Sequence, residues 1–195
     1  MRRDVVTSML AIVVITIVFG IVYPLVVTGV AQVAFPGKAN GSKVSVDGRL
    51  VGSPLIAQDF RGQARYFQER PSTATSYNAA GSAFTNLGPN SITARNTFRA
   101  ALAAYLRREQ PYDPGLTASG VPIDAVTSSA SGIDPDISPA NAWIQARRVA
   151  AVRHLRLSTV DRLIGENTDG RFLGVLGEPG VNVLELNLTL DRMRR

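Results

Sequence analysis

The distribution of apolar residues divides the chain into two parts. No side chain from Val5 to Gly37 is charged, and sixteen of the positions from Val5 to Val30 are Val, Ile, Leu or Phe. A helix that crosses a bilayer needs about 20 such residues, whereas the apolar core of a signal peptide is only about 7–15 residues long. We therefore interpret this run as an uncleaved transmembrane anchor at residues 1–35, rather than as a signal peptide cleaved near Ala31. A folded domain follows at residues 36–195.

Two features of the anchor bear on its surroundings. Pro24 lacks a backbone donor and predicts a kink, which faces either a neighbouring helix or lipid. Arg2 and Arg3 favour a cytoplasmic N-terminus, whereas Lys38, Lys43 and Arg49 at the other end oppose it weakly. Because long C-terminal domains translocate largely regardless of charge, we expect a single-pass protein of the cell membrane with an extracytoplasmic domain.

The first half of the domain shows signals for a hairpin and a helix. Asp47–Gly48 is a strong turn signal between short apolar runs and predicts a hairpin over Val44–Val51. From Ile92 to Glu109 the apolar residues recur at helical spacing. We expect one face of this helix to be buried, made of Ala94, Phe98, Ala101, Leu102 and Tyr105.

The second half predicts two helices and a strand, which gives a mixed α/β (α+β) domain. Ser138 and Pro139 open the first helix as N-cap and first-turn proline. Its buried stripe is expected to hold Ala142, Trp143, Ala146, Val149 and Ala150. Ser158 is expected to cap a short helix through Ile164. Leucines alternate with polar residues from Leu184 to Leu190, which predicts a half-buried strand.

The charged and polar residues offer little catalytic chemistry. The net charge is +6, but the arginines are scattered, so we expect no nucleic-acid partner. The chain has no cysteine, which excludes thiol chemistry. His154 is its one histidine, so a serine triad could use only that residue as its base, and a zinc site with several histidine ligands is excluded. We therefore expect no catalytic residue and no metal site.

Three polar features allow alternative interpretations. Asp134 and Asp136 could bind a cation or act as acid and base, but two turn residues ahead of a helix are the favoured interpretation. Arg153 lies in the buried arc of its helix and is either paired with an acid or snorkelling, and we favour snorkelling. The hydroxyl-rich segment Thr127–Gly132 could contact a phosphate, but it lacks a P-loop lysine, so a connecting loop is favoured.

Six segments, taken in order after one N-terminal span, resemble the KdpC family, the C subunit of the bacterial potassium-transporting P-type ATPase. They are GSPLIAQ (52–58), YFQERPS (66–72), TNLGPN (85–90), VPIDAVT (121–127), SASGIDPDISP (129–139) and GEPGVNVLELN (177–187). The resemblance covers nearly the whole chain. One departure is Ala130, where a glycine often stands between the two serines.

The resemblance implies an accessory subunit of an ATP-driven, high-affinity potassium importer. Its partners would be a channel-like potassium-binding subunit, a P-type ATPase subunit and a small peptide subunit, in contact with membrane lipid. The family is described as stabilising the complex and as raising the ATP affinity of the ATPase subunit. The implied nucleotide contacts are Ser129, Ser131, Gly132 and Gln145, with no tightly bound cofactor and with ATP reached through the partner.

The orientation of the anchor argues for a different role, because ATP would lie across the membrane from an extracytoplasmic domain. A cap near the potassium entrance fits that orientation better. Two alternatives outside transport are a membrane-anchored exported hydrolase, with Ser129 or Ser131 as nucleophile beside Asp134 or Asp136, and a tethered solute-binding module.

Overall fold

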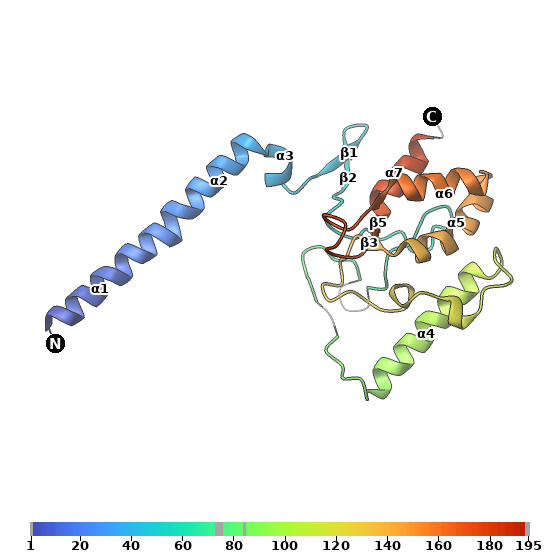
Figure 1. The fold of residues 1–195 in the computed structure, drawn as a ribbon, viewed down its shortest axis with the longest axis horizontal. Coiled ribbons are helices and arrows are strands. Elements are labelled where there is room, and N and C mark those ends of the chain that lie inside the picture. Colours follow the sequence, from blue (N-terminus) through green and yellow to red (C-terminus); the bar gives the residue numbers. More distant parts are fainter. Residues whose placement is uncertain (1, 73–75, 84, 194–195) are drawn as a thin grey trace. The chain divides into compact units, whose positions relative to one another are not determined.

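The computed structural model describes residues 2–72, 76–83 and 85–193. The chain separates into two compact units, residues 1–43 and 44–195 (Figure 1). The first unit is helical. It contains α1 (Arg2–Ile17), the π-helical turn η1 (Val18–Val22), α2 (Tyr23–Ala34) and the short α3 (Pro36–Ala39).

The first three of these elements form one continuous helix without a buried residue. Residues 2–34 have a stretch of mean hydropathy 2.9, and this is the helix, among those that the structure describes, with the length and apolar character to cross a membrane. The Tyr23 N–H donates to the Val18 carbonyl across the π turn, one turn before Pro24. Proline clashes with the carbonyl four residues earlier, and a wider π turn is one way to accommodate it. The chain thus absorbs Pro24 without breaking the helix.

The second unit begins with the predicted hairpin. Strands β1 (Val44–Val46) and β2 (Arg49–Gly52) pair antiparallel. The two turn residues, Asp47 and Gly48, have φ of 50° and 77°. Left-handed backbone at both positions matches the twist of the flanking strands, which is why Asp-Gly is favoured there. The hairpin prediction is confirmed.

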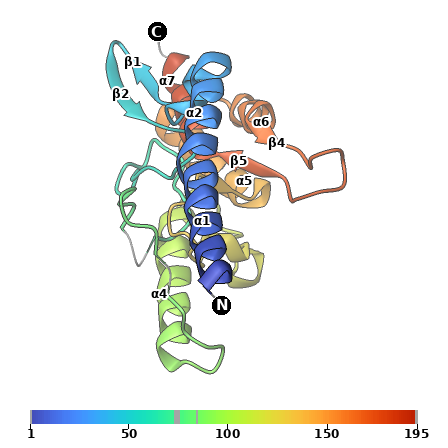
Figure 2. The same cartoon turned by 90° about the vertical axis from the view of Figure 1, so that its left-hand side faces the viewer.

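The main core lies between a small antiparallel sheet and three helices. The sheet has the order β3 (Asp136–Ile137), β5 (Gly180–Asn182), β4 (Thr168–Asp169). The helices are α5 (Pro139–Arg153), α6 (Leu157–Glu166) and α7 (Val183–Arg192), and α5 and α7 both pack on α6 (Figures 1 and 2). Residues from all three helices and from the sheet form one apolar cluster around Phe67. The mixed α/β class is confirmed.

A second, smaller cluster joins α4 (Ile92–Glu109) to the main body. The helix has the predicted bounds, and Ser91 caps it by accepting the Ala94 N–H. Tyr105 packs with Leu116 and Ala125 beside the 3₁₀ turns η2 (Ala118–Gly120) and η3 (Ile123–Ala125). The N-terminal half of α4 extends beyond this contact (Figure 2). Phe98 therefore stays half-exposed, although its face was predicted to be buried.

The predicted C-terminal strand is wrong, because these residues form α7. Asn182 caps the helix by accepting the Glu185 N–H at 3.2 Å. The buried positions include Val183, Leu186 and Leu190, which follow helical spacing. The alternating leucines suit both structures, and the capping residue followed three positions later by glutamate is the signal that decides between them.

Two details of α5 and α6 also differ from the prediction. Ser138 caps α5 and Pro139 stands in its first turn as expected, but Trp143 is 54% exposed rather than part of the buried stripe. Helix α6 begins at Leu157 after Arg156, one residue before the predicted cap Ser158. The other four stripe residues are buried, which confirms them.

Arg153 is paired with an acid, so the snorkelling interpretation is wrong. Its Nη2 lies 2.9 Å from Asp191 Oδ1 at the end of α7. Its Nε donates to the Arg65 carbonyl at 2.7 Å, and its guanidinium lies over the ring of Tyr66. The sequence did not identify Asp191 as the partner, because the residues before it were predicted to form a strand rather than the helix α7.

Candidate functional site

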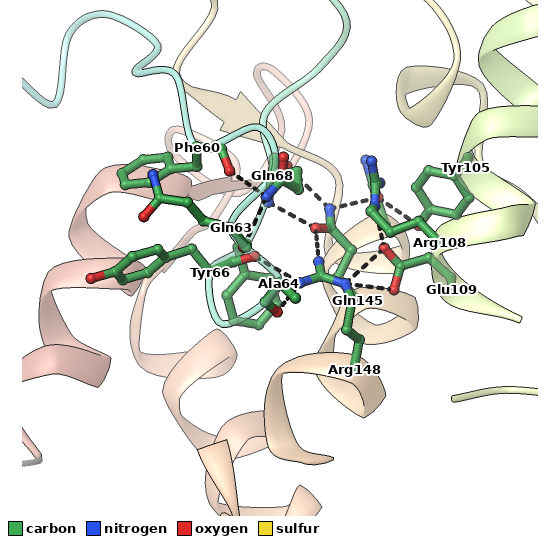
Figure 3. Close-up of polar contacts among 12 residues, drawn as sticks. Phe60, Gln63, Ala64, Tyr66, Gln68, Tyr105, Arg108, Glu109, Gln145 and Arg148 are labelled. Atoms are coloured by element: carbon green, nitrogen blue, oxygen red, sulfur yellow. Dashed lines mark hydrogen bonds and ion pairs between the residues drawn. The ribbon is translucent and has the colours of Figure 1, made fainter. Parts of the chain in front are cut away.

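The segment 67–69 crosses the interior without forming a strand, and side chains satisfy its backbone. The Phe67 N–H donates to Asn187 Oδ1 at 2.9 Å, and Asn187 Nδ2 donates back to the Phe67 carbonyl at 3.1 Å. Gln145 binds Gln68 in the same way. The Gln68 N–H donates to Gln145 Oε1 at 2.8 Å, and Gln145 Nε2 donates to the Gln68 carbonyl at 3.1 Å (Figure 3). Buried backbone groups need such partners. Each carboxamide thus replaces a strand neighbour, and we call these two pairs the carboxamide clamps.

The side chain of Gln145 is fully occupied inside the domain. Besides the clamp on Gln68, its Nε2 donates to Asn141 Oδ1 at 3.0 Å and its Oε1 accepts from Arg148 Nη2 at 2.9 Å. A carboxamide offers two N–H groups and two acceptor lone pairs. All four are used, and Gln145 is 1% exposed.

A buried ion pair lies next to the Gln145 clamp. Arg148 Nε is 3.0 Å from Glu109 Oε2, and the two side chains are 1% and 0% exposed. Arg148 Nη1 also donates to the carbonyls of Ala64 and Tyr66 (Figure 3). Burial lowers the pKa of Arg148, and the charge of Glu109 opposes that change. Arg148 therefore joins α4, α5 and the segment that precedes the clamps.

A pocket of about 190 Å³ opens beside this network. Its lining combines clamp residues with charged ones: Arg61, Gln68, Glu69, Tyr105, Arg108 and Gln145 are among them. Glu69 Oε1 accepts the Gln58 N–H at 3.3 Å. Its other oxygen, Oε2, is buried and has no hydrogen-bond partner among the residues that the structure describes. Burial of a carboxylate oxygen without a hydrogen bond destabilises the ionised form of Glu69.

The state of Glu69 predicts a pH dependence of stability. Burial raises the pKa of Glu69 well above its usual range; the Gln58 N–H opposes this, and Asp134 and Asp136 add to it. Between the unfolded pKa of about 4.3 and the raised folded value, the folded chain binds more protons than the unfolded chain. The free energy of unfolding should therefore fall as pH rises through this window.

The Glu69→Gln variant tests that dependence, because glutamine keeps an acceptor for the Gln58 N–H and cannot ionise. We expect the variant to be more stable than the wild type at about pH 8, with a smaller difference at about pH 5. Denaturant unfolding of the full chain in detergent, followed by Trp143 emission, measures both. An unchanged pH dependence in the variant would contradict the assignment.

Hydrogen bonds of Ser129 and Ser131 help to fix the conformation of the hydroxyl-rich segment Thr127–Gly132, which we call the serine loop. Ser129 Oγ accepts the Gly132 N–H at 2.9 Å and lies 3.2 Å from Ser131 Oγ. Ser131 Oγ accepts the Ile133 N–H at 3.2 Å. The Gly132 carbonyl accepts from Ser72 Oγ at 2.6 Å. The amides of Gly132 and Ile133 therefore bind serine hydroxyls of the same loop.

The structure brings together three of the four predicted site residues. Ser129, Ser131 and Gly132 share the loop, whereas the hydrogen-bond partners of Gln145 lie outside it, on the segment 67–69 and on α5. The four residues remain predicted nucleotide contacts.

The hydrolase alternative receives no support from this geometry. Among the described residues, neither serine hydroxyl contacts a base, and Asp134 approaches Ser129 only through its backbone N–H, at 3.4 Å. The Asp134 carboxylate instead pairs with Arg70 at 2.9 Å. Asp136 accepts from Asn182 at 3.1 Å. Within the described ranges, His, Cys, Asp and Glu form no group of three or more that could hold a metal ion.

Several residues of the network escaped sequence reasoning. Glu109 stands four positions after Tyr105 on the predicted buried face, and Arg148 lies between Gln145 and Val149 in the buried part of α5. A charged residue at a predicted buried position was the available signal, because such residues are rarely buried unless paired. Asn187 was missed for another reason, since the strand prediction put it on the wet face.

Comparison with known proteins agrees with this arrangement of segments. The KdpC family model, described as "K+-transporting ATPase, c chain", matches residues 5–192. A potassium-transporting ATPase KdpC subunit of Koribacter versatilis is 44% identical over 192 residues, covering 98% of this chain and 95% of the relative. The one from Mycobacterium tuberculosis is 46% identical over 194 residues, covering 99% and 100%. That of Burkholderia vietnamiensis is 51% identical over 181 residues, covering 91% and 90%. The chain therefore belongs to the KdpC family, the c chain of potassium-transporting ATPases.

Proposed function

We propose that this chain stabilises the assembly of a potassium-transporting ATPase as a non-catalytic subunit, with its domain on the extracytoplasmic side. The observation that carries the proposal is the internal use of its polar groups. Gln145 and Ser129 use their polar groups for hydrogen bonds inside the domain, and among the described residues neither Ser129 nor Ser131 contacts a base. Such a domain suits binding to other subunits better than chemistry. Arg2 and Arg3 at the start of the helix support the orientation.

A half-open groove beside α4 supports a role in assembly. It has a volume of about 410 Å³ and continues into a second hollow of about 170 Å³. Leu87, Ala94, Phe98 and Val126 line both. Phe98 and Leu87 each expose nearly half of their surface, although both are large and apolar. Contiguous exposed apolar surface on a folded domain commonly marks a protein contact.

The charge at the rim of this groove specifies its occupant. Arg95 and Arg99 line the groove, and neither forms an ion pair with another described residue. A segment with apolar side chains flanked by carboxylates would bury Phe98 and neutralise both arginines. We therefore assign the groove to an acidic, amphipathic segment of another subunit of the complex.

The Phe98→Glu variant tests this assignment. Glutamate removes the apolar contact and places a negative charge among carboxylates, so we expect at least about a tenfold loss of co-purification with the other subunits, equivalent to about 1.4 kcal/mol. The measurement is affinity purification of the full chain with its complex from membranes. The matched control is Ala103→Glu on the exposed face of the same helix, which should co-purify as the wild type does.

The two variants distinguish the possible results. Loss with Phe98→Glu alone supports the groove as an interface, provided that both variants unfold at the same denaturant concentration. Equal co-purification of both variants with the wild type rules the groove out. A wild-type chain that co-purifies with no other subunit contradicts the proposed function itself.

A further inference from the structure

The connection between β4 and β5 carries an apolar tip that the proposed function leaves unused. Residues Phe172 and Leu176 form an antiparallel bridge, which closes a tight hairpin. The four large apolar residues of the tip are all strongly exposed: Phe172 69%, Leu173 79%, Val175 72% and Leu176 58%. Figure 2 shows this connection extending away from the helices. A single exposed apolar residue is ordinary, whereas four large apolar residues on one projecting turn indicate a binding surface.

Four of the five backbone N–H groups of residues 172–176 are paired within the hairpin. The N–H groups of Phe172, Gly174, Val175 and Leu176 all donate within the hairpin, to the carbonyls of Leu176, Arg171 and Phe172. In a hydrocarbon environment water cannot compensate an unpaired N–H or C=O. A turn that pairs most of its own amides can therefore enter an apolar medium with a smaller desolvation penalty than an ordinary loop.

The choice of residue at the turn is also unusual. Leu173 and Gly174 have φ of 52° and 77°, so both are left-handed. Glycine, asparagine and aspartate are the usual residues in such positions. Leucine is unfavourable there for the fold, and a local outlier of this kind is a reason to look for function. An apolar side chain at the summit of the turn is useful if the tip binds an apolar surface.

The charges stay at the base of the hairpin. Arg171 and Glu178 flank the tip and pair with each other at 2.8 Å. Between them, residues 172–177 contain no charged side chain. A convex apolar knob above a charged base is the arrangement of an interfacial membrane anchor, in which the apolar part enters the acyl region and the charged part stays at the headgroups.

A short connection tethers the domain to the apolar helix. Residues 35–43 connect the apolar helix to the first strand of the domain, and nine residues span at most about 30 Å when fully extended. Part of this connection is the helix α3, which shortens it further. A domain tethered this closely meets the membrane surface at a high effective concentration.

We propose that the hairpin 171–178 inserts its apolar tip into the lipid bilayer, as a second membrane contact of the domain. The proposal rests on the N-terminal helix being embedded in the membrane. It does not rest on the groove beside α4. A fluid acyl layer fits a convex tip that offers no polar side chains for directional contacts, whereas a protein partner would need a matching concave pocket.

A fluorescent probe in the tip tests the proposal on the full chain. Trp143 is the only tryptophan, so a Trp143→Phe chain with Phe172→Trp reports on the tip alone. The chain is reconstituted into phosphatidylcholine vesicles with or without brominated acyl chains, which quench tryptophan on contact. We expect blue-shifted emission and at least twofold quenching by the brominated lipid. The matched control is Trp143→Phe with Ile123→Trp, because Ile123 is 74% exposed and lies on η3.

Each result decides the question. Quenching of the Phe172→Trp probe well above that of the Ile123→Trp control supports insertion. Equal quenching of the two probes overturns it, as does a blue shift that appears only in the assembled complex and without quenching, which would assign the tip to a partner subunit. A chain that fails to float with the vesicles overturns the embedded helix and the proposal together. Quenching is measured on this chain alone in vesicles, and the assembled complex is a second, separate sample, so loss of co-purification with other subunits does not affect the quenching result.

Discussion

Replacing Arg148 with alanine is expected to lower the free energy of unfolding by about 3–5 kcal/mol. Arg148 and Glu109 are 1% and 0% exposed, so the substitution leaves a buried carboxylate without its main partner. It also removes the donor to the carbonyls of Ala64 and Tyr66. Arg108 Nε remains 2.6 Å from Glu109 and limits the loss, but it reaches only one side of the carboxylate.

The neighbouring arginine provides the control for this experiment. Arg147 stands on the same helix, is 52% exposed and pairs with Asp113 at 3.3 Å. Exposed ion pairs contribute about 0–1 kcal/mol, so Arg147→Ala should cost less than about 1 kcal/mol. Denaturant unfolding of the full chain in detergent, followed by Trp143 emission, compares the two. Similar losses for both variants would show that the buried pair adds nothing beyond helix propensity and general charge.

Local signals in the sequence were sufficient for most of the elements. The Asp47–Gly48 turn, the bounds of α4 and the cap of α5 depend on the residues at those positions, and each formed as predicted. The segment Val183–Arg192 did not, because its leucines satisfy a period of two and a helical spacing alike. A tertiary contact favours the helix over the strand, because the helix places Asn187 against Phe67.

The candidate site was harder to predict, because its contacts join residues far apart in the chain. Gln145 and Gln68 are separated by 77 positions, and Asn187 and Phe67 by 120. Neither carboxamide carries a local signal for the backbone group that it binds. The resemblance to the KdpC family drew attention to Gln145 as a ligand contact, whereas the geometry shows the structural work that it performs within the domain.

Replacing Gln145 with methionine is expected to lower the free energy of unfolding by about 2–4 kcal/mol, because the near-isosteric side chain leaves the Gln68 N–H and carbonyl and one Arg148 donor without partners. The loss is measured by the same unfolding experiment. Asn187→Leu is the matched comparison: it removes the other clamp, on Phe67, and the family resemblance gives Asn187 no nucleotide contact.

This pair of variants separates a structural role of Gln145 from a nucleotide contact. If Gln145 acts by holding the segment 67–69, both variants lose similar stability, and complexes assembled well below their unfolding temperatures hydrolyse ATP with the wild-type KM. If Gln145 contacts nucleotide, only Gln145→Met raises the KM for ATP, while Asn187→Leu leaves it unchanged. We expect the first result, because the carboxamide already makes four hydrogen bonds to three buried residues and has nothing to offer a ligand unless the clamp on Gln68 opens.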